Sequence, residues 1–321
     1  MNDTPISEVD WEKTSEATIK RIMDEGIITV GQLLTYTPEE LAEKIKSQVS
    51  TVDKVINQAM KQYGGFKKGD EVAEEQSKRF KLSTGSSSLD RLLQGGIEAE
   101  VITELISEYK GGKTQQCFTS AVIAVNQEPD PERGKPHVVF IDCENTWQST
   151  RIAEIASARG FNPEDTLSRF IIAKPLNSYH QHLLINALDK ALSDNYVNLV
   201  IVDGMLSHLR GEYLGREMMG KRQGNLGSML GKLLSIASSY RIPVMITNQV
   251  QGNVTGYGPA FNPAGGHVMA HACTHRIMYK KATRNSRIVN VLDSPNISDE
   301  ESVRIAITRA GITDEGALNE S

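Results

Sequence analysis

Hydrophobic residues form continuous runs through the middle of the chain instead of alternating with polar ones. Four such runs lie at 101–106, 137–142, 198–203 and 242–247. Runs of this kind are typical of strands buried on both faces of a sheet. Amphipathic stretches with the spacing of βαβ crossovers lie at 152–159, 179–193 and 222–239. The pattern predicts an α/β fold with a mostly parallel central sheet. Antiparallel strands are expected to extend that sheet at 275–281, 287–293 and 302–308.

The first 63 residues have a helical pattern instead. Ser15 precedes an apolar series that ends at Gly26, which is a favourable place for a helix to stop. Thr37 to Glu40 form a capping box with proline at the first helical position, and Ser50 begins a further helical pattern. The sequence therefore predicts a small all-α domain over residues 1–63.

The composition changes at Gly64-Gly65, where a mainly polar stretch begins. We predict a linker over 64–81 and the larger α/β domain over 82–321. Phe66 is an apolar side chain directly after the two glycines. It either packs on its own domain or inserts into a pocket of another subunit, and composition alone favours local packing.

Composition excludes several classes of protein. No apolar run approaches the ~18 residues of a membrane span, and Met1 to Thr4 do not begin a secretory signal. Cys117, Cys143 and Cys273 are isolated within apolar segments and are predicted to be reduced core residues. The formal net charge of −5 excludes a uniformly basic surface, so any nucleic-acid binding must be local. We expect a soluble cytoplasmic protein.

A strand, a short glycine-containing loop and a helix start follow one another between Glu100 and Ser120. In a phosphate-binding loop, backbone N–H groups surround the phosphates, a lysine reaches the β and γ oxygens, and a Ser/Thr hydroxyl binds Mg²⁺. Lys113 and Thr114 have those two positions. The nucleotide-binding segment is therefore predicted to comprise Ser107, Glu108, Tyr109, Lys110, Gly111, Gly112, Lys113, Thr114 and Gln115.

Ser107 stands where the usual phosphate-loop pattern begins with glycine. If the backbone there is one that only glycine adopts easily, Ser107 stores strain. If the backbone is an ordinary β conformation, the hydroxyl faces solvent or a neighbouring amide. We favour the second interpretation.

Polar residues also end three of the predicted strands, and ligands of open α/β sheets bind at such strand ends. Asp203 fits an acid that holds Mg²⁺ opposite Thr114; alternatively, it only caps the next turn. Glu144 is placed to activate a water for attack on the γ-phosphate; alternatively, it stabilises a helix N-terminus. Gln249, in the pair Asn248-Gln249, would sense the γ-phosphate or lie in a solvated turn.

Two segments are predicted to be mobile loops that bind single-stranded DNA. The segment 209–223 interleaves basic residues with apolar ones, and 251–266 has no charged residue but several glycines. Positive charge beside an apolar flexible loop suits phosphates and bases respectively. The alternative is that both segments are ordinary surface loops without a binding role. His267, which follows the second segment, is either a buried histidine or a link between that loop and the nucleotide. The DNA-binding candidates are Arg210, Arg216, Arg222, Tyr257 and Phe261.

The chain from Phe66 to about Thr308 resembles an archaeal-type RadA recombinase of the RecA superfamily. The matching motifs keep the family's order and separation: LSTGSSSLDRLLQGGIE (82–98), GGKTQ (111–115), IDCENTWQSTRI (141–152), LVIVDG (199–204), RGEYLGR (210–216), TNQV (247–250), GGHVMAHA (265–272) and LDSPNISDEE (292–301). The resemblance implies a RecA-like ATPase core that uses ATP and Mg²⁺ and associates with the nucleoid. It also implies a homo-oligomeric filament or ring acting on single- and double-stranded DNA.

The resemblance also implies residue roles. It assigns Lys113, Glu144 and Gln249 to catalysis, Thr114 and Asp203 to the metal, and Arg151 to stacking on adenine. Asp293 and Pro295 match a cap that closes over the nucleotide of the neighbouring subunit. Phe66 with Gly69 matches a plug that inserts into the next subunit, which reverses the preference stated above for Phe66.

The chain also departs from the family pattern. Asn145-Thr146-Trp147 stands where Gly-Thr-Phe is usual, Gly204 replaces Ser or Thr, and the N-terminal domain lacks the Gly-Val-Gly turns of a helix-hairpin-helix. Two functions therefore stay open: a strand-exchange recombinase, or a paralogue that binds ATP and DNA and assists filament assembly. A hexameric helicase or signalling ATPase is disfavoured by the plug and the cap.

Overall fold

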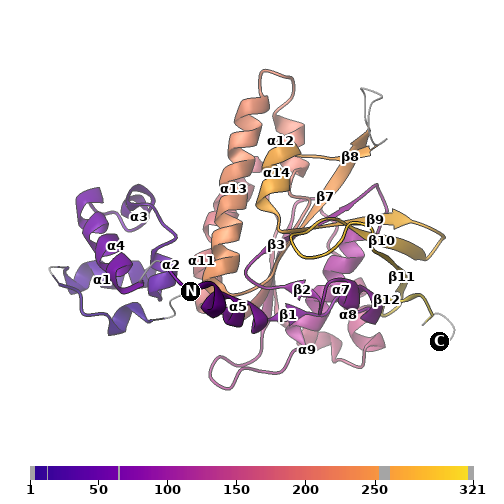
Figure 1. Cartoon of the computed structure of the whole chain (residues 1–321), viewed down its shortest axis with the longest axis horizontal. Helices are drawn as coiled ribbons and strands as arrows, with labels where there is room; N and C mark the ends of the chain where they lie inside the picture. Colours follow the sequence, from indigo (N-terminus) through magenta and orange to yellow (C-terminus); the bar gives the residue numbers. More distant parts are fainter. Residues whose placement is uncertain (1–3, 13, 64–65, 253–260, 317–321) are drawn as a thin grey trace.

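The computed structural model describes residues 4–12, 14–63, 66–252 and 261–316, and it divides them between a small helical part and a larger α/β part (Figure 1). The small part contains a 3₁₀ turn (Ile6–Glu8) and helices α1 (Glu16–Asp24), α2 (Val30–Leu33), α3 (Pro38–Lys44) and α4 (Val49–Tyr63). Its core is made of aliphatic side chains from all of these helices. The larger part is a mixed α/β domain.

The helix starts of the small part follow the local sequence. The Ser15 hydroxyl accepts from the backbone N–H of Thr18, and Gly26 after α1 has a φ of +82°. Thr37 forms the expected capping box of α3 with Glu40. A second capping box, from Thr29 to Gln32, starts the short helix α2, whose start is not located in the sequence pattern.

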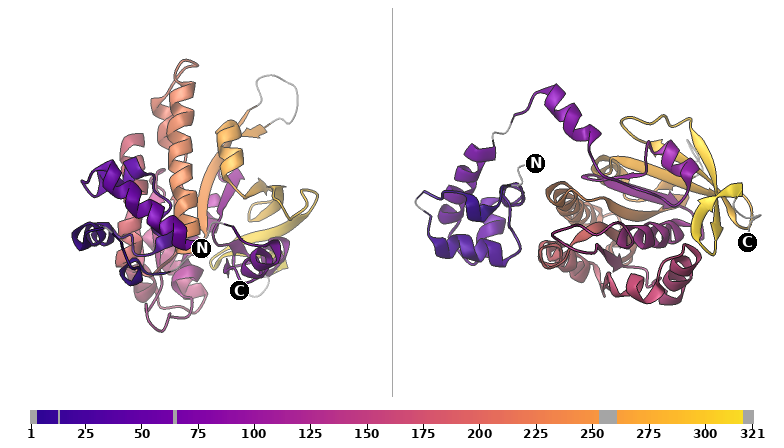
Figure 2. Two further views of the ribbon diagram at one scale, coloured as in Figure 1. Left: turned by 60° about the vertical axis from the view of Figure 1, so that its left-hand side comes forward. Right: turned by 90° about the horizontal axis from the view of Figure 1, so that it is seen from below.

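The segment predicted to be a linker contains a helix. Phe66 is 100% exposed, so it does not pack on its own domain as composition alone suggested. Three residues later Gly69 begins α5 (Gly69–Ser77), which buries none of its side chains. Helix α5 runs between the two parts of the molecule (Figure 2).

One ten-stranded sheet forms the centre of the larger part. Its strand order is β12-β11-β10-β9-β3-β7-β6-β4-β5, with β8 paired to β7. The strands from β9 to β5 along this order are parallel to their neighbours, whereas β10, β11 and β12 add antiparallel pairs. The bounds are β3 (Ile102–Ser107), β4 (His137–Asp142), β5 (Phe170–Ala173), β6 (Val197–Asp203), β7 (Val244–Gly252), β8 (Phe261–Pro263), β9 (His275–Lys281), β10 (Ser286–Asp293), β11 (Ser302–Thr308) and β12 (Gly311–Asp314).

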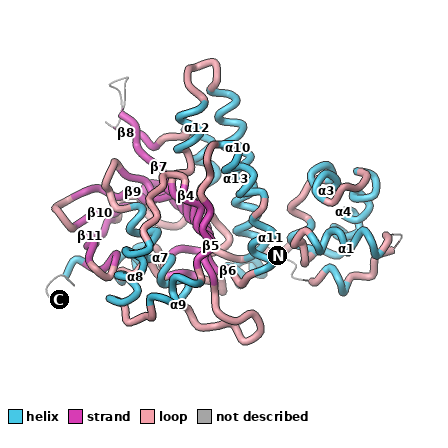
Figure 3. The backbone as a smooth tube through the Cα atoms, turned by 180° about the vertical axis from the view of Figure 1, so that it is seen from behind, coloured by secondary structure: helices cyan, strands magenta, loops and turns pink. Residues whose placement is uncertain are grey.

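Helices cover both faces of this sheet, because its strands are apolar on both sides. Leu199 and Ile201 of β6 pack towards α7 (Lys113–Val125) and α8 (Ser149–Ala158). Val200 and Val202 of the same strand pack towards α11 (Leu188–Asp194) and α13 (Met219–Tyr240) on the other face (Figure 3). The remaining helices are α6 (Ser87–Leu92), α9 (Pro163–Ser168), α10 (Ser178–Asn186), α12 (Ser207–Glu212) and α14 (Gly266–Ala272), and β1 (Lys81–Leu82) pairs with β2 (Ile97–Glu98).

Several sequence predictions need correction. The helix expected over 179–193 is divided into α10 and α11, and the segment 209–223, predicted to be a loop, is largely helical in α12 and α13. Asn248 and Gln249 do not end a strand, since β7 continues to Gly252.

The three cysteines are buried free thiols, as predicted. In the described parts of the chain, no helix has both the length and the apolar character that crossing a bilayer requires.

The helical part docks on the larger part through a compact polar contact. The Tyr36 hydroxyl donates to the Asp189 carboxylate, and the Lys232 ammonium lies 2.5 Å from the same carboxylate oxygen. The Lys232 Nζ also lies 4.3 Å from the centre of the Tyr36 ring. Burial and the Asp189 charge raise the pKa of Tyr36, so it stays a hydrogen-bond donor. Because Asp189 is only 3% exposed, its contact with Lys232 is a desolvated ion pair, and the Tyr36 hydroxyl donates to the same carboxylate.

We expect Asp189→Ala to release the helical part from the larger one. The change leaves the Tyr36 hydroxyl without its acceptor and the Lys232 charge with only the Tyr36 oxygen at 2.9 Å, a loss of about 3 kcal/mol or more in a buried pair. Limited proteolysis should cut faster near α5, and the radius of gyration should increase. Asp194→Ala is the matched control on the same helix, because its pairing with Lys190 is exposed and is worth only ~0.3–0.5 kcal/mol. Equal behaviour of the two variants would contradict the assignment.

Candidate nucleotide-binding site

The loop between β3 and α7 has the backbone of an anion-binding turn. Gly112, the N-cap of α7, has a φ of +113°, and no side chain caps the first turn of this helix. The N–H groups of that turn therefore stay available to an anion at the positive end of α7. Lys110 has a φ of +60°, which is the left-handed region and costs a non-glycine residue some strain. The geometry fits the phosphates of a nucleotide.

The Lys113 side chain returns across this loop. Its ammonium lies 2.8 Å from the hydroxyl of Ser107 and 3.4 Å from the Ser107 carbonyl oxygen. Burial lowers the pKa of Lys113, while the nearby carboxylates of Glu144 and Asp203 oppose that shift. A desolvated cation at this position favours binding of a phosphate.

Three hydroxyl groups surround the carboxylate of Asp203. Thr247 donates to one oxygen at 2.6 Å, and Thr114 and Thr146 each donate to the other at 2.9 Å. Asp203 is completely buried, and this desolvation raises its pKa although the three hydrogen bonds oppose the shift. Hydroxyl and carboxylate oxygens are the ligands that Mg²⁺ prefers, so Thr114 and Asp203 would hold the metal of a magnesium nucleotide. Asp203 joins three elements instead of only capping the next turn.

Glu144 lies on the other side of Asp203, in the turn after β4. One of its oxygens accepts from Ser207 and from the amide of Gln249, both at 2.9 Å. All three residues line a cavity of about 220 Å³ together with Arg210. Gly204 permits this approach, because a Cβ built there would lie 2.5 Å from the Glu144 Cγ. The structure thus brings Glu144 and Gln249 together, as the prediction for the γ-phosphate end of the site requires.

Two groups fix the turn that carries Glu144. The Asp142 carboxylate accepts from the backbone N–H groups of Thr146 and Trp147 at 2.9 and 3.0 Å. The Trp147 ring packs against Phe140 and Phe170, with ring centres 5.4 and 5.1 Å apart. Tryptophan here in place of the family's phenylalanine therefore anchors the turn in the core. Asn145 in the same turn has a φ of +54°, a region in which glycine is the easier residue.

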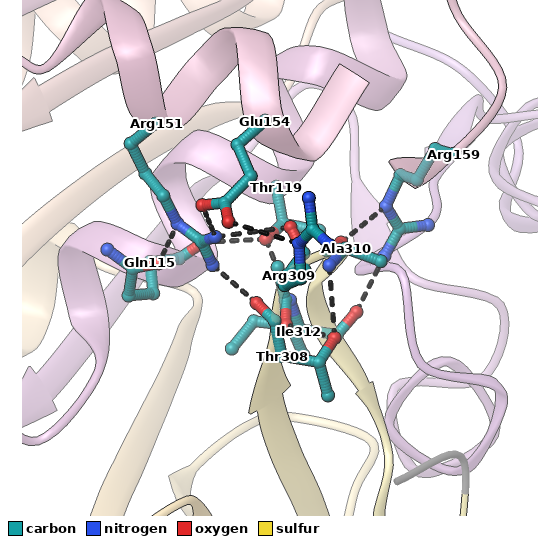
Figure 4. A network of polar contacts seen from close by, with 10 residues as sticks. Gln115, Thr119, Arg151, Glu154, Arg159, Thr308, Arg309, Ala310 and Ile312 are labelled. Atoms are coloured by element: carbon teal, nitrogen blue, oxygen red, sulfur yellow. Dashed lines mark hydrogen bonds and ion pairs between the residues drawn. The ribbon is translucent and has the colours of Figure 1, made fainter. Parts of the chain in front are cut away.

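Arg151 is held firmly at the edge of the site by bonds to its nitrogen atoms (Figure 4). It donates to the Gln115 side chain at 2.9 Å, to the Thr308 carbonyl at 2.6 Å and to the Glu154 carboxylate. Glu154 also pairs with Arg309 at 3.4 Å. Because guanidinium N–H groups lie in the plane of the group, these bonds fix that plane. The assignment of Arg151 to adenine stacking stays a prediction, with which a fixed guanidinium plane is compatible.

Asn248, next to Gln249, is buried and not in a solvated turn. Its amide donates to the Glu104 carboxylate at 2.6 Å and to the Ala264 carbonyl at 2.7 Å. Arg276 of β9 completes the group with a bond of 2.6 Å to Glu104. Glu104 and Arg276 are not among the site residues predicted from the sequence. The available signal was a glutamate inside the apolar run 101–106, since a buried charge requires a partner.

The predicted DNA-binding residues are only partly brought together. Arg210 lies in α12 and is exposed beside the Glu144 cavity, whereas Arg216 is exposed in the turn between α12 and α13. Arg222 is half-buried in α13. Tyr257 lies outside the described residues, and for Phe261 only its backbone place at the start of β8 is described. Their roles stay predictions.

The cap residues do not join the site within one chain. Arg287, near the start of β10, donates to the Gly111 carbonyl of the phosphate loop at 2.8 Å. Asp293 ends the same strand six residues later, about 20 Å along β10 from Arg287 at roughly 3.3 Å per residue. Asp293 and Pro295 are both exposed. His267, which the sequence left open, is exposed on α14 and stacks on His271 with ring centres 5.9 Å apart.

A protein-family model described as Rad51 matches residues 75–315. The chain belongs to the Rad51 family. The matched region includes the whole central sheet and every described residue of the nucleotide site. Membership gives the fold a name, the RecA fold. It also connects the protein with DNA recombination and repair and with the binding of ATP and DNA. The match does not include helices α1 to α4.

The burial of Asp203 predicts a stabilising variant. Since its pKa is raised in the folded protein, Asp203 favours folding when protonated, and that contribution is lost as the pH rises through the raised pKa. Asp203→Asn should therefore increase the Tm of the nucleotide-free protein at neutral pH. The difference from wild type should shrink as the pH is lowered. Because Asp203→Asn also removes a proposed ligand of the metal, Mg²⁺-nucleotide should no longer raise the Tm of this variant. A Tm below that of the wild type at pH 7 would contradict the destabilising effect assigned to the buried charge.

Proposed function

We propose that this protein is an ATP-dependent strand-exchange recombinase of the archaeal RadA type. It would form a helical filament on single-stranded DNA, pair that strand with homologous double-stranded DNA and associate with the nucleoid. The observation that carries the proposal is the contact between Glu144 and Gln249. Gln249 lies in β7, and this strand continues towards the second predicted DNA loop. In this proposal the same strand connects the predicted γ-phosphate sensor Gln249 to the segment predicted to bind DNA.

In this proposal ATP with Mg²⁺ supplies the phosphoanhydride bond that is hydrolysed. Lys113 and the N–H groups at the start of α7 bind the phosphates, and Thr114 with Asp203 holds the metal. Glu144 accepts a proton from the attacking water, and its bonds to Ser207 and Gln249 orient its carboxylate for that task. The family shows ATP binding in general, whereas these individual roles are part of the proposal.

Filament formation is supported by two exposed segments. Phe66 is 100% exposed, although a phenylalanine side chain gains free energy from burial. Asp293 and Pro295 are exposed at the end of β10 opposite to Arg287, the residue of that strand that contacts the phosphate loop, so we propose that they act at the nucleotide of a second subunit. A filament in which each subunit inserts Phe66 into one neighbour and closes over its nucleotide would employ both.

A second candidate is a recombinase paralogue that binds ATP and DNA without catalysing exchange. Ser107 favours the paralogue, because the Ser107 hydroxyl already accepts a hydrogen bond from the Lys113 ammonium, which the phosphates require. Joint-molecule formation between homologous single- and double-stranded DNA, with ATP and with a slowly hydrolysed analogue, separates the two functions. Joint molecules with either nucleotide would support the recombinase. ATP-dependent DNA binding without joint molecules would favour the paralogue.

We expect Glu144→Gln to lose most ATP hydrolysis and to retain nucleotide and DNA binding. The amide keeps the size of the side chain and removes the base, which should lower turnover by ~10²–10⁴-fold. Phosphate release and fluorescent-nucleotide binding measure the two properties separately. Unchanged turnover would show that another group activates the water.

Phe66→Ala should disperse the DNA-free oligomer while each subunit stays folded. In a subunit contact, loss of a buried phenylalanine typically removes ~3–5 kcal/mol. Light scattering gives the assembly size and circular dichroism the folded state. Met60→Ala is the control: it removes a different exposed apolar side chain, which lies on α4, and should leave the assembly unchanged. If both variants assemble like the wild type, Phe66 is not the plug.

A further inference from the structure

Ser107 has no exposed surface, and its hydroxyl lies inside the phosphate loop. The hydroxyl donates its single hydrogen to the Glu108 carbonyl at 2.7 Å. Its oxygen is therefore left to accept, and the group opposite at 2.8 Å is the Lys113 ammonium. The sequence-based expectation that this hydroxyl faces solvent or a backbone amide was wrong. The expectation of an ordinary backbone was correct, because Ser107 is the last residue of β3.

Gly111 shows how closely the loop is fitted around this side chain. A Cβ built at Gly111 would lie 2.2 Å from the Ser107 hydroxyl oxygen and 2.3 Å from its Cβ. Real Cβ atoms essentially never approach a neighbour so closely, so residues 107 and 111 compete for one volume. Serine at 107 therefore requires glycine at 111.

The hydrogen bond to Ser107 uses the Lys113 ammonium, the cation that is proposed to bind the phosphates of the nucleotide. A lysine ammonium has three hydrogens to donate, and two of the three are directed at Ser107, one strongly to the hydroxyl and one weakly to the carbonyl. Lys113 is 8% exposed, so water does not replace a lost partner easily. A glycine at 107 would offer only the carbonyl.

We propose that Ser107 is a positioning residue that holds the Lys113 ammonium in the nucleotide-free loop and competes with the phosphates of ATP for it. The side chain thereby stabilises the empty loop and weakens nucleotide binding. The inference rests on the proposed ATP site and adds a determinant of its affinity that the phosphate-loop pattern, with glycine at this place, does not contain.

The first experiment measures binding and stability in the same variant. Ser107→Ala should lower the Tm of the nucleotide-free protein and bind a fluorescent ATP analogue about tenfold more tightly, as expected when a hydrogen bond to a charged group no longer opposes binding. Ser120→Ala is the matched control. It removes a buried hydroxyl on α7 that accepts from Gln116 at 2.9 Å, so its Tm should fall with unchanged nucleotide affinity.

A double-mutant cycle tests the contact without nucleotide. Ser107→Ala should lower the Tm in the wild-type background and have little effect in a Lys113→Met background, because the partner is already absent. Additive losses would show that Ser107 acts through another group. A second cycle tests the shared volume: Gly111→Ala should be strongly destabilising alone and better tolerated together with Ser107→Gly.

The outcomes separate the two hypotheses. Unchanged or weaker binding of the ATP analogue by Ser107→Ala would overturn the competition while leaving the ATP site intact. A wild-type protein that binds neither ATP nor ADP would overturn the proposed function itself. Tighter binding together with a lower nucleotide-free Tm supports the proposal, since a merely structural serine would lower stability without improving affinity.

Discussion

The nucleotide site depends on the burial of one carboxylate. Asp203 has no exposed surface, and a buried carboxylate is tolerated only if its oxygens receive hydrogen bonds. Thr114 at the start of α7, Thr146 after β4 and Thr247 in β7 supply them, so three elements are tied to the end of β6. The Thr247 hydroxyl also accepts from the Gly204 N–H at 2.7 Å, so the turn after β6 belongs to the same network. The starts of α7, of the turn after β4 and of the turn after β6 are thus placed relative to a single charge.

The rest of the larger part holds these elements at fixed separations. Parallel strands bring their carboxyl ends to the same edge of the sheet, and the aliphatic layers on both faces fix the strands. The aromatic cluster around Trp147 does the same for the turn after β4. Within the sheet, the buried pair of Glu104 and Arg276 holds the Asn248 amide, which also donates to the Ala264 carbonyl. Apolar packing therefore determines where the polar groups stand, and the polar groups determine which ligand fits there.

Much of the fold could be predicted from the sequence, because buried parallel strands and capping boxes have local signals. The grouping of Lys113, Thr114, Asp203 and Glu144 was likewise accessible, since Lys113 and Thr114 begin a helix, Asp203 ends a strand and Glu144 closely follows another strand. The Ser107 contact was not, because it depends on the path of the Lys113 side chain across the loop. Helix α5 was not predicted either, since a helix that buries nothing leaves no apolar periodicity in the sequence. The basic segment 209–223 looked like a loop because its polar residues and glycines mask its helical turns.

The pairing of β7 with β8 also has a consequence for evolution of the second predicted DNA loop. Val250 pairs with Pro263 and Gly252 with Phe261, so the ends of the intervening segment are joined by the sheet itself. The entropic cost of joining two fixed ends by a chain segment grows only with the logarithm of the segment's length, and each doubling costs about 0.6 kcal/mol. Insertions or deletions between Gly252 and Phe261 should therefore scarcely affect the stability of the domain. In the proposed function, selection can therefore change the length and composition of that segment, while β7 keeps the strict requirements of a buried strand.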